Sequence, residues 1–244
     1  MFLFLLGSIL MRSAGCIVND ISDKEFDKKV SRTKNRPVAS GKISITLALV
    51  YTLMLCLLAL LVLINFNLYT ILLAIGSVPL AFAYPLMKRF TYWPQLFLGI
   101  TFNYGLILGW VSIKNNLDIV PIVFYLGAIF WTLGYDTIYG YQDIKDDEII
   151  GVKSTSIKFK ENPNLFLIIC YSIFVLSLLT VGMYMKFNYF FYFSILVSIF
   201  HLFYYQIKKF EFNNSANCLK IFKSNNFFGF LIFLNILIGK LFNV

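Results

Sequence analysis

Two groups of carboxylate side chains, each beside a long apolar run, are the residues of this chain best suited to do chemistry. They lie in the stretches 19–27 and 136–147, within what we predict to be the two longest polar loops. On a helix, at about 100° per residue, three aspartates of each group share one face, roughly 60° wide in the first group and roughly 40° wide in the second. The first three are Asp20, Asp23 and Asp27, and the second three are Asp136, Asp143 and Asp147. Carboxylates crowded on one face repel each other unless a cation lies between them, so two such faces at a membrane surface favour Mg²⁺ that holds a diphosphate.

Further oxygen ligands lie at helical spacing from these aspartates. Asn19 is one turn before Asp23, and Asp143 and Asp147 repeat the same i,i+4 spacing. The alternative is a solvated loop face on which aspartates pair with neighbouring lysines. Two groups in matching positions of the chain favour the metal site over that alternative. Secondary candidates for the same site are Asp20, Asp136, Tyr139 and Asp146.

Cations that could meet a diphosphate follow another apolar run. Tyr84 and Lys88 are spaced i,i+4, and Arg89 comes next in the chain. These cations could hold diphosphate oxygens or a substrate carboxylate, which a guanidinium binds through two hydrogen bonds. The alternative is a basic anchor at a helix end. Arg12 lies inside an apolar run, where it either pairs with an acidic residue or extends to the interface. His201, the one histidine of the chain, fits a packed polar contact better than a catalyst.

Composition predicts an all-α polytopic membrane protein. The chain has 244 residues, 59% of them hydrophobic, and a mean hydropathy of +0.76. Several apolar runs approach or exceed the ~20 residues that cross a bilayer, and only helices satisfy their backbone within one segment in lipid. The eight predicted spans are 2–18, 43–65, 68–86, 94–112, 118–138, 163–184, 188–206 and 226–242.

The distribution of charge predicts the orientation of these spans. The net charge is +9, and most of the 21 basic residues lie in loops that share one side if every run crosses. This asymmetry places the acidic groups in the cytoplasm and both chain ends outside, and it argues against nucleic acid as the partner. Four cysteines without metal-site spacing indicate neither disulfides nor thiolate metal sites. The first run lacks a basic start and contains Arg12, so we expect a span and no cleaved signal.

The ordered motifs resemble those of the UbiA superfamily of intramembrane aromatic prenyltransferases, over nearly the whole chain. The first family signature, NDxxDxxxD, is matched by Asn19, Asp20, Asp23 and Asp27. The second, a Tyr-Asp-rich segment that ends in DxxxD, is matched by Tyr135, Asp136, Tyr139, Asp143 and Asp147. The intervening YxxxK is matched by Tyr84 and Lys88. Within the family, the likeness is greatest to bacterial members that prenylate 4-hydroxybenzoate in ubiquinone biosynthesis.

The resemblance implies a nine-helix bundle with a polar cap, and Mg²⁺ that joins the acidic motifs to a polyprenyl diphosphate. The implied metal ligands are Asn19, Asp23, Asp27, Asp143 and Asp147. The implied catalytic residues are Asp23, Asp27, Asp143, Asp147 and Arg89, with Arg89 orienting the aromatic acid. The implied substrate-binding residues are Tyr84, Lys88, Arg89, Arg36 and Lys153. The implied partners are the two substrates and the lipid bilayer of the bacterial inner membrane, with no obligate protein partner.

The sequence departs from the family pattern before the first acidic motif. The family has a further helix there, so we expect residues 1–244 to form one membrane domain without the family's first helix. Asn103 and Tyr104 are a lesser departure. Three alternatives stay open: a prenyltransferase for another quinone precursor or for haem, a truncated inactive remnant, and a small transporter. A transporter would carry polar residues at mid-membrane along several spans, and few are present.

Overall fold

A computed structural model describes residues 2–241 of the chain, and the regular secondary structure within this range is helical, with no strand. The helices that cross or nearly cross the bundle are α1 (Phe2–Asp27), α2 (Ile45–Leu63), α3 (Leu68–Ala83), α5 (Pro94–Lys114), α6 (Ile119–Gly140), α9 (Pro163–Tyr184), α10 (Tyr189–Ile199) and α11 (Ser215–Leu241). The short segments are the 3₁₀ turn η1 (Tyr84–Leu86), α4 (Met87–Phe90), α7 (Ile144–Ile150), α8 (Thr155–Lys158) and the π-helical η2 (Phe200–Lys208).

Eight helical stretches of the described chain are long and apolar enough to span a membrane, which confirms the predicted number of spans. Two of them are composite, because η1 and α4 continue α3 to residue 90 and η2 continues α10 to residue 208. The last span begins at Ser215, earlier than predicted, and residue 242 at its predicted end lies outside the described residues.

Local sequence signals account for several helix starts. The Ser44 hydroxyl accepts a hydrogen bond from the Leu47 amide at 3.2 Å, which caps α2. Asn67 caps α3 through the Thr70 amide at 2.9 Å, and its own amide nitrogen donates to the Val111 carbonyl of α5 at 3.0 Å. Helices α5 and α9 each begin with proline, whose missing N–H is not needed in the first turn.

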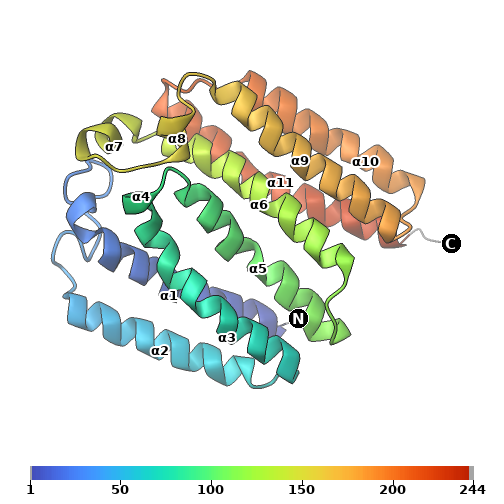
Figure 1. Ribbon diagram of the computed structural model, residues 1–244, viewed down its shortest axis with the longest axis horizontal. Helices are drawn as coiled ribbons and strands as arrows, with labels where there is room; N and C mark the ends of the chain where they lie inside the picture. Colours follow the sequence, from blue (N-terminus) through green and yellow to red (C-terminus); the bar gives the residue numbers. More distant parts are fainter. Residues whose placement is uncertain (1, 242–244) are drawn as a thin grey trace.

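The spanning helices form two groups that meet along α5 and α6 (Figure 1). The first group contains α1, α2, α3 and α5, and the second contains α6, α9, α10 and α11. Helices α4, α7 and α8 and the connection 28–44 gather at one end of the bundle, and we call these segments the polar cap. The N-terminal end of α1 and the C-terminal end of α11 lie at the opposite end, as the predicted topology requires.

Helices α6 and α9 approach closely because α6 presents glycine to α9. A Cβ atom on Gly127 would lie 2.5 Å from the Ser177 Cβ, and one on Gly134 would lie 2.5 Å from the Tyr171 ring. Small residues at an interface let backbones approach, which is how helices in lipid gain packing contacts. The core of the second group is built on this contact, with Tyr171 and Phe174 fully buried.

A buried polar network joins α6, α9, η2 and α11. Gln206 of η2 is fully buried, accepts a hydrogen bond from the Tyr171 hydroxyl at 2.5 Å and donates to the Asn225 side chain at 2.9 Å. The Trp131 indole of α6 donates to the same Asn225 oxygen at 2.9 Å. His201 lies 3.4 Å from the Gln206 amide nitrogen, which confirms its prediction as a packed polar contact.

The helix ends differ from the prediction at both acidic groups. Helix α1 continues through Asp27, so the first group is helical and does not lie in a loop. The second group is not on one helix, because α6 ends at Gly140 and α7 begins at Ile144, with Asp143 at its start. The shared helical face predicted for Asp136, Asp143 and Asp147 is therefore wrong, although the three side chains still meet at one site, as described below. The four cysteines are free thiols.

Candidate active site at the polar end of the bundle

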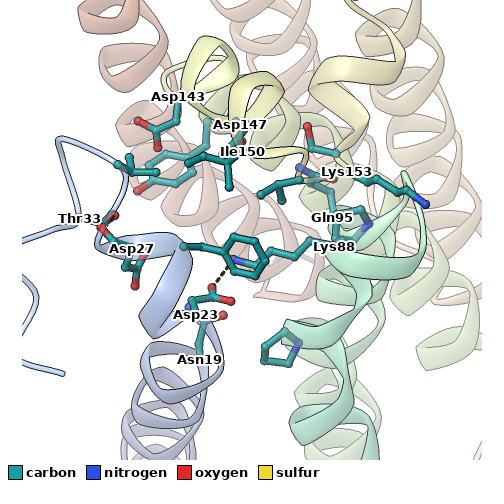
Figure 2. Close-up of a pocket in the computed structure, with 18 of the residues that line it drawn as sticks. Asn19, Asp23, Asp27, Thr33, Lys88, Gln95, Asp143, Asp147, Ile150 and Lys153 are labelled. Atoms are coloured by element: carbon teal, nitrogen blue, oxygen red, sulfur yellow. Dashed lines mark hydrogen bonds and ion pairs between the residues drawn. The ribbon is translucent and has the colours of Figure 1, made fainter. Parts of the chain in front are cut away.

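A cavity of about 300 Å³ lies under the polar cap, between the two groups of helices (Figure 2). Its walls come from the last turns of α1, the connection 28–44, η1 with α4, the first turns of α5, the end of α6, and α7 with the segments on either side of it. The predicted site residues that line it are Asn19, Asp23, Asp27, Arg36, Tyr84, Lys88, Asp136, Tyr139, Asp143, Asp147 and Lys153. Residues more than 100 positions apart therefore meet as the two acidic motifs predict.

Asp23 is the most deeply placed carboxylate of the first motif that has a direct cationic partner. Its side chain is 7% exposed, and its Oδ2 atom lies 2.6 Å from the Lys88 ammonium of α4. Its other oxygen, Oδ1, is buried and has no hydrogen-bond partner among the described residues. A buried oxygen without a partner is costly, so this atom is available to a ligand such as a cation.

Arg36 neutralises the rest of the first motif. Its Nη1 atom lies 3.0 Å from Asp20 Oδ1 and 3.0 Å from Asp27 Oδ2, so the connection 28–44 folds back onto α1. The Thr33 hydroxyl donates to the Asp27 carbonyl at 3.1 Å and helps hold this return. Arg36 is therefore both a wall of the cavity and the anchor of the connection.

Arg32 joins the connection that follows the first acidic motif to the second motif. Its Nε atom lies 3.1 Å and 3.0 Å from the two Asp143 oxygens, and its Nη2 atom lies 2.5 Å from Asp143 Oδ2. The guanidinium also lies 5.2 Å from the Tyr139 ring centroid, within cation–π range. Sequence reasoning did not single out Arg32. The basic stretch after the first motif contains it, but nothing in that stretch distinguishes it from its neighbours.

Asp147 lies on α7, and its side chain is half-buried. Burial, with the nearby Asp143 carboxylate adding to it, raises the pKa of Asp147 to about 6, while Lys88 acts in the opposite direction. A cation bound beside it would favour the charged form. Helix α7 ends at Ile150 and is capped by Gly151, whose φ of 80° suits glycine. The Gly151 and Val152 amides both donate to the Asp147 carbonyl at 3.0 Å. This turn directs the chain back toward α4.

Three predicted residues, Asp20, Arg89 and Asp146, are not among the residues that line the cavity. Asp20 pairs with Arg36, as described above. The Arg89 guanidinium donates to the Ser22 carbonyl of α1 at 2.5 Å and lies 5.5 Å from the Phe26 ring. Asp146 borders a second, smaller hollow of about 210 Å³, between the segment 141–146 and the residues around the start of α11. The structure thus shows Arg89 binding the backbone of the first motif, and its role toward an aromatic acid stays a prediction.

Arg12 does not pair with an acidic residue among those that the structure describes, so its extension to the membrane interface stays a prediction. Its guanidinium lies 4.9 Å above the Phe102 ring of α5. A cation–π contact of this kind compensates part of the cost of a charge at membrane depth.

The side chains present suit Mg²⁺ held jointly with a diphosphate. The carboxylates and the Asn19 amide at the cavity offer oxygen ligands, which Mg²⁺ prefers, and Asp23 Oδ1 is an unpartnered ligand atom among the described residues. Among the described residues, however, no cluster of three acidic, cysteine or histidine side chains is close enough to hold a metal ion alone. Phosphate oxygens would therefore have to complete the coordination, as is usual for Mg²⁺. Asn19, Asp23 and Asp27 from one motif and Asp143 and Asp147 from the other are the residues that would hold it.

The Lys88–Asp23 pair gives a stability prediction. Lys88→Met removes the partner of a carboxylate that is 7% exposed, so we expect a loss of about 3–5 kcal/mol of unfolding free energy. A thermal unfolding scan of the purified protein without metal measures this loss. Lys28→Met, which breaks an exposed i,i+3 pair with Glu25, is the matched control and should change the midpoint little. Equal effects of the two variants would contradict the buried pair.

Comparisons with known proteins agree with this geometry. A model of the UbiA prenyltransferase family matches residues 1–235. The chain is 43% identical over 241 residues to the mitochondrial 4-hydroxybenzoate polyprenyltransferase of Rattus norvegicus, and 42% identical over 240 residues to that of Homo sapiens. Each match covers 98% of this chain and 64% of the relative, so the chain spans less than two thirds of their length.

Solved structures share the fold at low sequence identity. The apo structure of a UbiA homolog from Aeropyrum pernix K1 matches with a TM-score of 0.80 and 19% identity, over 96% of this chain and 89% of that one. A UbiA homolog from Archaeoglobus fulgidus bound to DMAPP and Mg²⁺ matches with a TM-score of 0.68 and 20% identity, over 98% and 85%. With the family model covering nearly all of its residues, the chain belongs to the UbiA prenyltransferase family.

Proposed function

We propose that this chain transfers a polyprenyl group from polyprenyl diphosphate to the ring of 4-hydroxybenzoate, in the membrane. The observation that carries the proposal is that one cavity brings together both acidic motifs and the cations Arg32, Arg36, Lys88 and Lys153. The names of the relatives described above support the choice of acceptor, and the Archaeoglobus fulgidus homolog bound to DMAPP and Mg²⁺ supports the metal. The substrates and the metal dependence of this chain are part of the proposal.

The chemistry is an electrophilic substitution. The allylic C–O bond breaks, the diphosphate leaves with both electrons, a C–C bond forms at the ring carbon beside the phenol hydroxyl, and that carbon loses its proton. When bound, Mg²⁺ supplies positive charge beside the departing diphosphate. Lys88 and Lys153 add fixed positive charge at the same wall, which stabilises the charge that develops on the leaving oxygen. The apolar tail would lie among the spanning helices.

The acid group of the acceptor needs a cation as well. We propose Arg89 for this role, because its guanidinium is held at the rim of the first motif by the Ser22 carbonyl and the Phe26 ring. Binding the acceptor would require this guanidinium to turn from Ser22 toward the cavity. Its planar fork suits a carboxylate.

The proposal also includes the membrane in which the chain works. The basic polar cap favours a cytoplasmic orientation in a bacterial inner membrane. The relatives described above are mitochondrial, which supports a membrane where ubiquinone is made without distinguishing between the two compartments.

Transfer of a labelled prenyl diphosphate to 4-hydroxybenzoate, in membranes that contain this chain, tests the proposal. We expect Mg²⁺-dependent product that disappears with EDTA and returns with added Mg²⁺. Haem and other aromatic precursors serve as alternative acceptors in parallel reactions. Product with one of these and none with 4-hydroxybenzoate would change the acceptor, and no product with any acceptor would contradict the proposed transfer.

A further inference from the structure

Gln95, which is neither acidic nor basic, lies in the wall of the cavity between two lysines. It is the second residue of α5, after Pro94, and is 7% exposed. It lines the cavity together with Lys88 and Lys153, and Figure 2 shows it with these two lysines on the wall opposite the first acidic motif. Burying an amide side chain costs free energy unless its polar atoms have hydrogen-bond partners.

One end of the Gln95 amide has a fixed partner. Its Oε1 atom accepts a hydrogen bond from the Thr155 backbone amide at 3.0 Å, at the start of α8. A backbone N–H only donates, so the oxygen must face Thr155 and the amide cannot be turned over. The Nε2 group therefore points the other way, and no acceptor for it is found among the described residues.

The partner of Gln95 is itself rigidly held. The Thr155 hydroxyl lies 2.6 Å from the Thr137 hydroxyl of α6, and the Ser156 hydroxyl donates to the Thr137 carbonyl at 2.7 Å. A Cβ atom on Gly140 would collide with the Ser156 hydroxyl oxygen, so α6 approaches α8 closely here. These contacts hold the Thr155 amide in place, and through it the direction of the Gln95 amide.

The same segment places the two lysines. The Lys153 backbone amide donates to the Lys88 carbonyl at 3.0 Å, and the Lys153 ammonium donates to the Phe90 carbonyl at 3.2 Å. Lys88 in turn pairs with Asp23 across the cavity. Gln95 therefore lies between Lys88, whose ammonium faces the first acidic motif, and the segment that carries Lys153.

We propose that Gln95 binds the diphosphate of the prenyl donor directly, through a hydrogen bond from its Nε2 group to a diphosphate oxygen. Its Oε1 atom holds Thr155 at the same time, so one side chain joins the diphosphate to the α8 segment that carries Lys153. A neutral donor whose direction is fixed in advance stabilises negative charge without reorganisation. The inference rests on the proposed function, since it takes the cavity ligand to be a diphosphate.

The substitution Gln95→Glu separates the two roles of the side chain. Glutamate keeps an oxygen for the Thr155 amide and replaces the donor by a second acceptor, which repels a diphosphate. We expect a KM for the prenyl diphosphate that is at least about 10- to 100-fold higher, because a hydrogen bond to a charged group is lost. We also expect the thermal midpoint without ligand to stay near that of the wild type, and the stabilisation by inorganic pyrophosphate with Mg²⁺ to disappear.

Gln142→Glu is the matched control. It makes the same atom exchange and adds the same charge one residue before Asp143, but its side chain is not among the residues that line the cavity and instead bonds the Tyr139 carbonyl. A similar rise in KM in this control would mean that added charge, and not the lost donor, causes the effect, and would overturn the inference. Gln95→Leu provides an uncharged variant that loses both the donor and the anchor, so its KM should rise and its midpoint should fall.

Wild-type KM and wild-type stabilisation by pyrophosphate in Gln95→Glu, or wild-type KM in Gln95→Leu, would overturn the inference while the proposed function stands. Wild-type protein that neither transfers the prenyl group nor gains stability from pyrophosphate with Mg²⁺ would contradict the proposed function, and this inference with it. The binding readout does not depend on turnover, so the two failures are distinguishable.

Discussion

Replacing Asp23 by asparagine is expected to lower kcat for prenyl transfer by at least about 100- to 1,000-fold. Asp23 has the buried oxygen without a partner and the pair with Lys88, so it is the carboxylate of the first motif best placed to hold a cation against a diphosphate. Removing one preorganised charge interaction from a transition state costs about 3–4 kcal/mol, and each 1.36 kcal/mol is a factor of ten in rate. Asp143→Asn should have an effect of the same order, because the second motif completes the site.

The control for this substitution is Asp118→Asn at the other end of the bundle. Asp118 caps α6 through the Ile119 amide, and asparagine caps as well as aspartate, so the fold and the turnover should both be preserved. Initial rates with saturating prenyl diphosphate and Mg²⁺ make the comparison. Turnover within a few fold of the wild type in both Asp23→Asn and Asp143→Asn would remove the basis for placing the metal between the motifs.

Adding a methyl group at both Gly127 and Gly134 is expected to destabilise the protein strongly. A Cβ atom at either position lies 2.5 Å from a carbon of α9, in the Ser177 side chain or the Tyr171 ring, so α6 and α9 must separate. Overpacking of this kind costs about 1–3 kcal/mol per site. The two sites are about 10 Å apart along the helix, so the costs should nearly add to about 2–6 kcal/mol. That sum is comparable to the whole stability of many proteins.

The thermal midpoint and the monodisperse fraction in detergent measure this effect. The double variant Gly76→Ala with Gly105→Ala is the matched control, since a Cβ atom at either of those positions, on α3 and α5, meets nothing within 4 Å. Alanine favours helices over glycine, so this control should be neutral or slightly stabilising. Similar midpoints for the two double variants would show that α6 and α9 tolerate a wider separation than the structure indicates.

The eight spans could be predicted from sequence because the constraint behind them is local. Lipid offers no hydrogen bonds to the backbone, so an apolar run of sufficient length must form a helix. Each spanning helix can therefore be recognised from its own residues. The first acidic motif was predictable for the same reason, because Asn19, Asp23 and Asp27 lie on one continuous helix whose period places them together.

Features that depend on distant segments were not predictable. The chain leaves the helical path after Gly140, so the helical arc assigned to the second motif failed, yet Asp136, Asp143 and Asp147 all line the cavity. Arg32 gains its importance from Asp143, which is 111 positions away, and its neighbours in the basic stretch look equivalent in sequence. A role for Gln95 depends on the position of α8, which nothing in the region around residue 95 indicates.

The amide network around Gln206 has a consequence for how the protein is made. Helices leave the ribosome in chain order, so α6 and α9 enter the membrane before η2 and α11 exist. Until then, the indole of Trp131 and the hydroxyl of Tyr171 lack the partners that Asn225 and Gln206 give them in the finished fold. In hydrocarbon such groups seek other partners, so a nascent chain stopped before α11 would keep its second half loosely assembled. Insertion of α11 supplies Asn225, whose hydrogen bonds with Trp131 and Gln206 join the earlier helices.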